Sequence, residues 1–275
     1  MTDNDRCIEV NDIKLHYIDW GSHGLQPMLL LHGFTGHAHV WDDFASRFRK
    51  DYHVIALDQR GHGESEWSKG GAYSLDDYFT DIVTFLDKIT KRSIILVGHS
   101  MGGRHALFYA SALPQNVFKL ILVDSRPGKS QRAANKLKHH LATLPLEADS
   151  FEEAARAIWD LYPYLTWPVC QSLASYGYQQ SQAGKVVPKY DVGMSEDAAR
   201  CGYVTEDLRP FLKSVKCPTL IIRGEDSEFL SREEAEEMYR LIPDAVFKEI
   251  PGSTHMPAHE NPEAFYNVVN EFLGK

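Results

Sequence analysis

A short segment of the chain combines a nucleophilic side chain with closely spaced glycines. Residues 98–103 read GHSMGG and fit the pattern G-x-S-x-G, between an apolar run at 94–97 and a helical stretch at 103–113. In a sharp strand-to-helix turn of this kind, the serine hydroxyl is exposed on a strained backbone, and side chains at the two glycines would collide with neighbouring backbone. The pattern therefore predicts that Ser100 is the nucleophile of an acyl-transfer enzyme.

A nucleophilic serine needs a general base, and thirteen histidines compete for that role. His255 stands out because it follows the predicted strand 246–250 and precedes the predicted helix 262–273, which preserves the chain order serine, acid, histidine. His99 flanks the nucleophile and is expected to point away from it. His62 lies in a glycine-rich loop, where a structural role is expected. We therefore predict that His255 is the base.

Three further motifs accompany the serine turn in a fixed order. They are HGFTG at 32–36, DQRGHG at 58–63 and GSTH at 252–255. Together with GHSMGG they resemble the conserved loops of the α/β-hydrolase superfamily, and the matches run from residue 28 to about 262. The resemblance implies an oxyanion hole made by the backbone N–H groups of Phe34 and Met101. It also implies that His32 orders its loop and takes no part in catalysis.

The carboxylate that would orient His255 is less clear from the sequence. A triad needs this acid to hold the histidine tautomer and to stabilise the imidazolium. By the resemblance, it usually stands three residues after the glycine that follows the strand predicted at 219–222. In this chain the glycine is Gly224, and three residues later comes Ser227, which is not an acid.

Three carboxylates remain as candidates for the acid. Asp226 and Glu228 flank the usual position, each one residue away. A shift of one residue along the chain turns the side chain well away from the direction that the triad requires. Asp124 follows the strand predicted at 120–123, a position at which some family members carry the acid. A loop aspartate there could instead cap its neighbour or pair with Arg126. We predict Asp124, with Asp226 as the second choice and Glu228 below both.

The elements around these motifs alternate between short apolar strands and amphipathic helices. The predicted strands are 13–18, 27–31, 54–57, 94–97, 120–123, 219–222 and 246–250, and the predicted helices are 40–48, 75–89, 103–113, 232–241 and 262–273. This alternation implies an α/β fold with a mostly parallel sheet and helices on both faces. Between about 130 and 205 the pattern is helical with no convincing strand. We therefore predict an α/β-hydrolase core at 1–129 and 206–275 with a helical cap at 130–205.

The predicted cap is rich in aromatic residues, which suggests an apolar substrate pocket. Most of these aromatics are expected to pack the cap onto the core. Trp159 and Tyr178 are predicted to contact the substrate.

The nucleophile type narrows the chemistry. Relatives that open epoxides or remove halogens use aspartate at the elbow, whereas this chain has Ser100, so hydrolysis of a small-molecule ester is the first expectation. No metal cluster, phosphate loop or dinucleotide motif is present, so no cofactor is implied. An alternative is a C–C/C–O lyase similar to the menaquinone-pathway synthase (MenH) family, or a C–C bond hydrolase. In that family an arginine matching Arg104 binds the substrate carboxylate, so the resemblance implies that Arg104 contacts substrate. Arg104 could instead be a helix-surface or salt-bridge residue. A non-catalytic ligand receptor on the same scaffold is a second alternative.

Composition limits the partners. The chain has 275 residues and a formal net charge of −9, which argues against nucleic acid or an anionic membrane surface. Four scattered cysteines and a polar N-terminal stretch without a signal-like apolar run are typical of a cytoplasmic protein. The sequence leaves a homodimer open.

Overall fold

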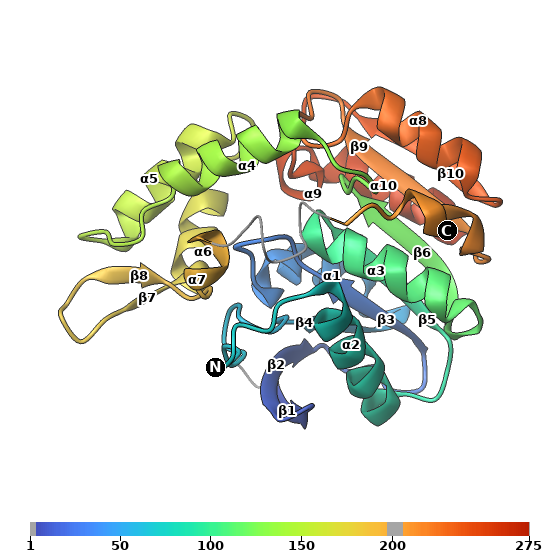
Figure 1. The fold of residues 1–275 in the computed structure, drawn as a ribbon, viewed down its shortest axis with the longest axis horizontal. Coiled ribbons are helices and arrows are strands. Elements are labelled where there is room, and N and C mark those ends of the chain that lie inside the picture. Colours follow the sequence, from blue (N-terminus) through green and yellow to red (C-terminus); the bar gives the residue numbers. More distant parts are fainter. Residues whose placement is uncertain (1–3, 197–205, 275) are drawn as a thin grey trace.

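The computed structural model describes residues 4–196 and 206–274, and its centre is an eight-stranded sheet (Figure 1). The strands are β1 (Asp5–Val10), β2 (Ile13–Asp19), β3 (Gln26–Leu31), β4 (Tyr52–Leu57), β5 (Ile94–His99), β6 (Val117–Val123), β9 (Thr219–Gly224) and β10 (Ala245–Ile250). Their order across the sheet is β1-β2-β4-β3-β5-β6-β9-β10. β1 pairs antiparallel with β2 and β2 antiparallel with β4, whereas the remaining pairs are parallel.

Helices cover both faces of this sheet. They are α1 (Asp42–Phe48), α2 (Leu75–Ile89), α3 (Met101–Ala112), α8 (Arg232–Leu241), α9 (Pro257–Glu260) and α10 (Pro262–Leu273), with short 3₁₀ turns η1 (Ala38–Trp41), η2 (Pro114–Asn116) and η3 (Arg209–Ser214). Successive strand residues point to opposite faces, so Leu29 and Leu31 share a core with α2, α3 and α8, while Met28 and Leu30 share one with α1 and α10. The predicted fold class is confirmed. Within the described residues, no helix has the length and apolarity needed to cross a membrane.

A separate group of elements lies between β6 and η3. It contains α4 (Gln131–Thr143), α5 (Phe151–Leu161), α6 (Trp167–Gly177), β7 (Tyr178–Gln180), β8 (Val186–Pro188) and α7 (Gly193–Glu196), and Figure 1 shows it to one side of the sheet. Small and branched residues such as Ala154, Ile158 and Ala174 give it a hydrophobic cluster of its own. We call residues 131–196 the cap. The predicted end of the insertion at residue 205 lies outside the described residues.

The expectation that the cap contains no strand is wrong. β7 and β8 pair as an antiparallel hairpin, in which Tyr178 faces Pro188 and Gln180 faces Val186. Gly184 occupies the connecting turn with a φ of 79°, a backbone conformation that glycine adopts without strain. Strands of three residues are too short for an alternating pattern to be recognised in the sequence.

Candidate active site

The chain makes a tight turn at Ser100, between β5 and α3. Ser100 has φ 51° and ψ −114°, which is a strained conformation for a residue with a side chain. A β carbon on Gly98 would lie 2.4 Å from the carbonyl oxygen of Gly102, and one on Gly102 would lie 2.5 Å from that of Leu31. The turn therefore needs glycine at both positions, as the G-x-S-x-G pattern predicts.

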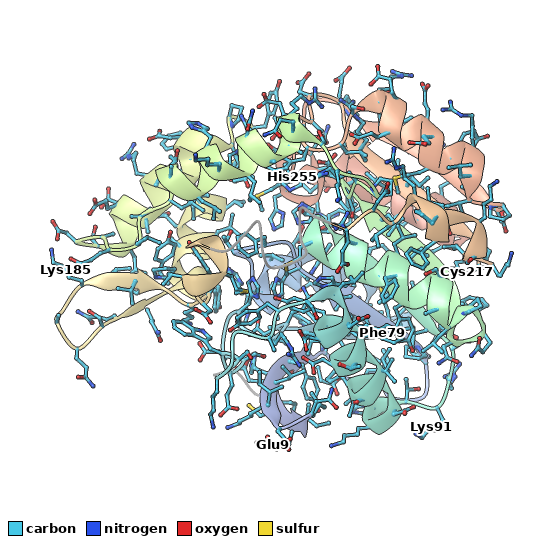
Figure 2. All side chains as sticks on the ribbon, viewed as in Figure 1. Glu9, Phe79, Lys91, Lys185, Cys217 and His255 are labelled. Carbon is cyan, nitrogen blue, oxygen red and sulfur yellow. The ribbon has the colours of Figure 1, made fainter. Side chains whose placement is uncertain are left out.

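Ser100, His255 and Asp124 form a continuous chain of hydrogen-bonding groups. The Ser100 hydroxyl lies 2.9 Å from Nε2 of His255, and Nδ1 of His255 lies 2.6 Å from Oδ2 of Asp124. All three side chains are buried. Figure 2 shows His255 in the interior of the molecule, whereas Lys91 and Lys185 lie at its margin. With the Nδ1–H donating to the carboxylate, Nε2 is left to accept the serine proton.

Contacts with the end of β9 and with the loop that follows it hold Asp124 in position. It has a φ of 45°, and its backbone N–H donates to the carbonyl of Ile222 at 2.7 Å. The Ser227 hydroxyl donates to Oδ2 at 2.7 Å, and the Gly224 N–H donates to Oδ1 at 3.1 Å. Ser227, which occupies the position at which the resemblance led us to expect the acid, therefore contacts the carboxylate of the predicted acid, Asp124.

The other two acid candidates face away from His255. Asp226 is exposed and accepts a hydrogen bond from the Tyr164 hydroxyl at 2.7 Å. Glu228 is also exposed and forms an ion pair with Lys136 on α4. The structure thus brings only the first of the three predicted acids to the histidine.

Burial sets the ionisation of the pair. It lowers the pKa of the His255 imidazole well below its usual value, and the nearby charge of Arg126 adds to this effect. Burial also raises the pKa of the Asp124 carboxyl, against the opposing effect of the hydrogen bonds from Ser227 and Gly224. An imidazole with a lowered pKa is neutral at neutral pH, which is the form that can accept a proton.

Two backbone segments flank the Ser100 hydroxyl. Met101 is the first residue of α3, where backbone N–H groups have no acceptor within the helix. Phe34 lies in the loop after β3, which is tied to α3 because the Gly102 N–H donates to the carbonyl of His32 at 3.1 Å. Nε2 of His32 accepts from the Gln59 N–H at 3.0 Å, so the buried imidazole orders this loop. These placements are compatible with the predicted oxyanion hole.

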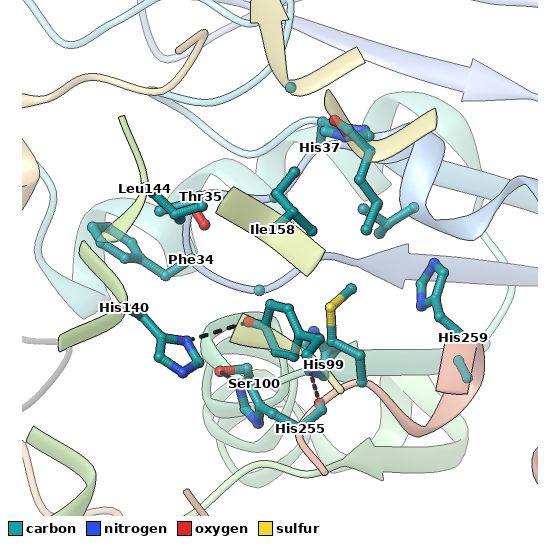
Figure 3. Close-up of a pocket in the computed structure, with 18 of the residues that line it drawn as sticks. Phe34, Thr35, His37, His99, Ser100, His140, Leu144, Ile158, His255 and His259 are labelled. Atoms are coloured by element: carbon teal, nitrogen blue, oxygen red, sulfur yellow. Dashed lines mark hydrogen bonds between the residues drawn. The ribbon is translucent and has the colours of Figure 1, made fainter. Parts of the chain in front are cut away.

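Two residues that hold the histidine loop were missed by the sequence reasoning. The His99 side chain turns toward His255, and its Nε2–H donates to the carbonyl of His255 at 2.7 Å (Figure 3). The Glu260 carboxylate accepts from the backbone N–H groups on both sides of His255, those of Thr254 at 2.7 Å and Met256 at 3.0 Å. A histidine next to the predicted nucleophile was the available signal for His99, whereas nothing in the local sequence marks Glu260.

A pocket of about 110 Å³ opens at Ser100, between the core loops and the cap. Its lining is mainly apolar and aromatic: Phe34, Val40, Trp41, Val123, Leu137, Leu141, Leu144, Ile158, Tyr162, Leu173, Tyr178, Tyr190, Phe229 and Met256, among others. Phe229 stacks on the His255 ring, with 4.0 Å between centroids. Tyr178, one of the predicted substrate contacts, lines the pocket.

The other two predicted substrate contacts lie elsewhere. Trp159 is 38% exposed and packs against Trp167 and the guanidinium of Arg156. It lies on a different side of α5 from Ile158, and Ile158 is the residue that lines the pocket. Arg104 is buried and is not among the lining residues. Its guanidinium donates to backbone carbonyls that include those of Arg126 and Glu206. The structure therefore does not bring Trp159 and Arg104 to this pocket, and their contact with substrate stays a prediction.

One group of metal-binding side chains occurs in the described part of the chain, away from the pocket. Donor atoms of Asp19, His23 and His53 lie within 4.8 Å of one another. One oxygen of Asp19 already accepts from His53 and from the Gly21 N–H, and His23 is largely exposed. No function is assigned to this group.

Comparison with known proteins agrees with the fold. The chain belongs to the α/β-hydrolase fold family, whose model matches residues 26–262. It is similar to 2-(acetamidomethylene)succinate hydrolase of Mesorhizobium japonicum, with 28% identity over 98% of this chain and 94% of that protein. A crystal structure of E-2-(acetamidomethylene)succinate hydrolase matches with a TM-score of 0.90 and 28% identity, covering 98% of this chain and 99% of that one. A Bacillus subtilis protein provisionally named 2-succinyl-6-hydroxy-2,4-cyclohexadiene-1-carboxylate synthase is 26% identical, with 97% of each chain covered.

Proposed function

We propose that the protein is a serine hydrolase that cleaves carboxylic esters with small to medium acyl or aryl groups, by way of an acyl-enzyme. The observation that carries this proposal is the contact of His255 with Ser100 at 2.9 Å and with Asp124 at 2.6 Å. A serine on a strained turn, a neutral imidazole and a buried carboxylate in this order form the arrangement that activates a hydroxyl for attack on a carbonyl.

The proposed reaction has two halves. Ser100 Oγ attacks the ester carbonyl carbon while Nε2 of His255 takes the hydroxyl proton, and the N–H groups of Met101 and Phe34 stabilise the oxyanion. The C–O bond to the alcohol then breaks, and the alcohol leaves with the proton from Nε2. A water molecule, deprotonated by His255, attacks the acyl-enzyme in the same way. The carboxylic acid is released, and Ser100 regains its proton.

The pocket lining supports a largely uncharged substrate. Among the described lining residues there is no lysine, arginine, aspartate or glutamate. A dianionic substrate would lose its hydration shell in such a pocket without a compensating charge, which is costly. The lyase alternative is disfavoured for the same reason, because Arg104 uses its guanidinium on backbone carbonyls outside the pocket.

A cytoplasmic setting is part of the proposal. Its support is that Cys7, Cys170 and Cys217 are free thiols. Free thiols persist in reducing compartments.

A labelling experiment combined with turnover tests the function. Wild-type protein should react with a fluorophosphonate probe and hydrolyse p-nitrophenyl esters, and Ser100→Ala should lose labelling and several orders of magnitude in kcat while staying folded. Ser175→Ala is a matched control, because this exposed serine lies on α6 and does not line the pocket. A panel of thioesters, lactones and amides would define the bond that is cleaved. Substantial turnover by purified Ser100→Ala would overturn the assignment.

A further inference from the structure

Five residues that line the pocket each have a buried polar atom with no hydrogen-bond partner among the described residues. One of these atoms is Nε1 of Trp41, and the other four are considered together. They are Nδ1 of His37, Nε2 of His140 and the hydroxyl oxygens of Tyr178 and Tyr190. Each of these side chains is at least 95% buried, with exposures of 3%, 5%, 5% and 3%. We call these four residues the polar wall. Figure 3 shows two of its members, His37 and His140, around the same pocket as Ser100 and His255.

An arrangement of this kind is costly unless a ligand uses it. A buried polar group without a partner costs about 1–3 kcal/mol, and native proteins contain few of them. Here five occur among the described residues that line one small pocket, and three of them belong to the cap. Phenylalanine would fill the place of either tyrosine without this cost, so packing alone does not account for the hydroxyls.

The protonation states of the polar wall define what it can bind. Burial raises the pKa of both tyrosines, that of Tyr190 to about 12, so both hydroxyls stay protonated and can donate. Burial lowers the pKa of His37 to about 4 and that of His140 to about 3, so both imidazoles are neutral at neutral pH. Nε2–H of His37 donates to the carbonyl of Leu173 at 3.3 Å, so the Nδ1 of this neutral imidazole can only accept. The two tyrosine hydroxyls are neutral donors, and such donors suit an uncharged oxygen acceptor better than a carboxylate, which would require a cation.

Two members of the polar wall lie near the proposed reaction centre. His140 lies beside the catalytic histidine, because its ring contacts Phe229 at 5.1 Å between centroids and Phe229 stacks on His255. Tyr190 packs against Phe34 at 6.0 Å, on the side of the predicted oxyanion loop. His140 and Tyr190 therefore lie close to the proposed base and to the predicted oxyanion loop, and His37 and Tyr178 line the same pocket.

We propose that the polar wall binds a second, uncharged oxygen function of the ester substrate, with the Tyr178 and Tyr190 hydroxyls as its main donors. The substrate class is thus esters that carry an ether, ketone or hydroxyl oxygen in addition to the scissile group, and plain hydrocarbon esters are inferior substrates. This proposal rests on the ester hydrolysis proposed above.

Matched ester pairs test the proposal. The two esters of each pair differ by one methylene replaced by oxygen. Two sets vary the acyl group: p-nitrophenyl pentanoate is compared with p-nitrophenyl 3-methoxypropanoate, and p-nitrophenyl hexanoate with its alkoxy isosteres. The third varies the alcohol group: butyl acetate is compared with 2-methoxyethyl acetate, and hydrolysis is measured by the release of acid. Wild-type protein should favour the oxygen-containing ester about tenfold in kcat/KM in at least one pair, because the hydrocarbon leaves buried donors unpaired. Tyr178→Phe and Tyr190→Phe should bring that ratio close to one.

A control variant and thermal unfolding separate recognition from structure. Tyr239→Phe also removes a tyrosine hydroxyl, but this side chain is exposed on α8 and does not line the pocket, so the ratio should not change. Loss of an unpartnered hydroxyl should leave Tm unchanged or raised in Tyr178→Phe and Tyr190→Phe. A marked fall in Tm would show that the hydroxyls are structural and would overturn the proposal.

Failure of this proposal is distinguishable from failure of the proposed function. If plain esters are hydrolysed in a Ser100-dependent manner but no pair shows a preference for oxygen, the polar wall does not recognise substrate oxygen. The same conclusion follows if a preference exists and neither phenylalanine variant reduces it. If no ester is hydrolysed at all, the proposed function fails and the proposed substrate class fails with it.

Discussion

Replacing Asp124 by asparagine should disable the enzyme by reversing the histidine tautomer. The Gly224 N–H donates to Oδ1 of Asp124 at 3.1 Å, so it would hold the amide oxygen of asparagine at that position. The amide nitrogen would then occupy the place of Oδ2, 2.6 Å from Nδ1 of His255. An N–H facing Nδ1 forces that nitrogen to accept, which moves the imidazole proton to Nε2. Nε2 would then have no lone pair for the Ser100 hydroxyl.

The expected size of this effect follows from the role of the acid. Loss of the correct tautomer in a triad reduces kcat about 10⁴-fold, which corresponds to about 5.5 kcal/mol of transition-state stabilisation. Asp226→Asn should lower kcat far less. Among the described residues, the only side-chain hydrogen bond of this exposed carboxylate is the one from the Tyr164 hydroxyl. Glu228→Gln removes a surface ion pair, which is worth about 0–1 kcal/mol.

The assay compares kcat and kcat/KM of the three variants with wild type and His255→Ala on the best p-nitrophenyl ester at neutral pH. Circular dichroism and thermal unfolding would check that each variant is folded, since Asp124 also contacts Ser227. Only Asp124→Asn should approach the severity of His255→Ala. If Asp226→Asn is the crippled variant and Asp124→Asn stays active, the tautomer argument and the assignment of the acid are both refuted.

Three further substitutions test how the site is built. Gly102→Ala should reduce the free energy of unfolding, measured by urea titration, by about 3 kcal/mol, because the alanine β carbon would lie 2.5 Å from a backbone oxygen. An unchanged urea midpoint of unfolding would contradict this close approach. His99→Phe keeps an aromatic ring but loses the hydrogen bond to the carbonyl of His255, so kcat should fall about tenfold while KM changes little. If the variant kept the kcat of the wild-type protein, this hydrogen bond would be dispensable. Burial lowers the pKa of His16, but its bonds to Asp58 and Asp5 raise it by more. Protonated His16 therefore stabilises the fold fully below about pH 6.5, and this contribution is lost as the pH rises through the raised folded-state pKa. His16→Gln should thus cost more stability at about pH 6 than at about pH 9, and equal losses in urea unfolding at both pH values would refute this.

Elements with strong local signals were predicted almost to the residue. The predicted helices 75–89, 232–241 and 262–273 agree with α2, α8 and α10. α2 and α8 each begin with a serine capping box, so an amphipathic period and a defined start act together. By contrast, β1 was not predicted, because its residues DRCIEV are largely polar and its pairing with β2 is a tertiary contact.

The site shows the same contrast: residues fixed by local sequence could be predicted, and residues fixed by tertiary contacts could not. Ser100 and the glycines around it are constrained by one turn, so their sequence pattern is sufficient to locate them. Asp124 could be ranked first only by counting to the usual position of the acid, and the sequence could not show that Ser227 would donate a hydrogen bond to it. Trp159 and Tyr178 are both cap aromatics, and only the rotation of α5 and the course of β7 determine which of them reaches the pocket.

Residues with a strained backbone occur at the ends of the three neighbouring strands that carry the site. Of the six described non-glycine residues with positive φ, three are Thr35, Ser100 and Asp124, with φ values of 62°, 51° and 45°. They follow β3, β5 and β6, which are neighbours in the sheet. Each such residue costs about 1–3 kcal/mol and persists only when its surroundings hold it. Because three adjacent strands end in strained turns, the predicted oxyanion loop, the proposed nucleophile and the proposed acid lie at the same edge of the sheet, where the paired strands hold them in place.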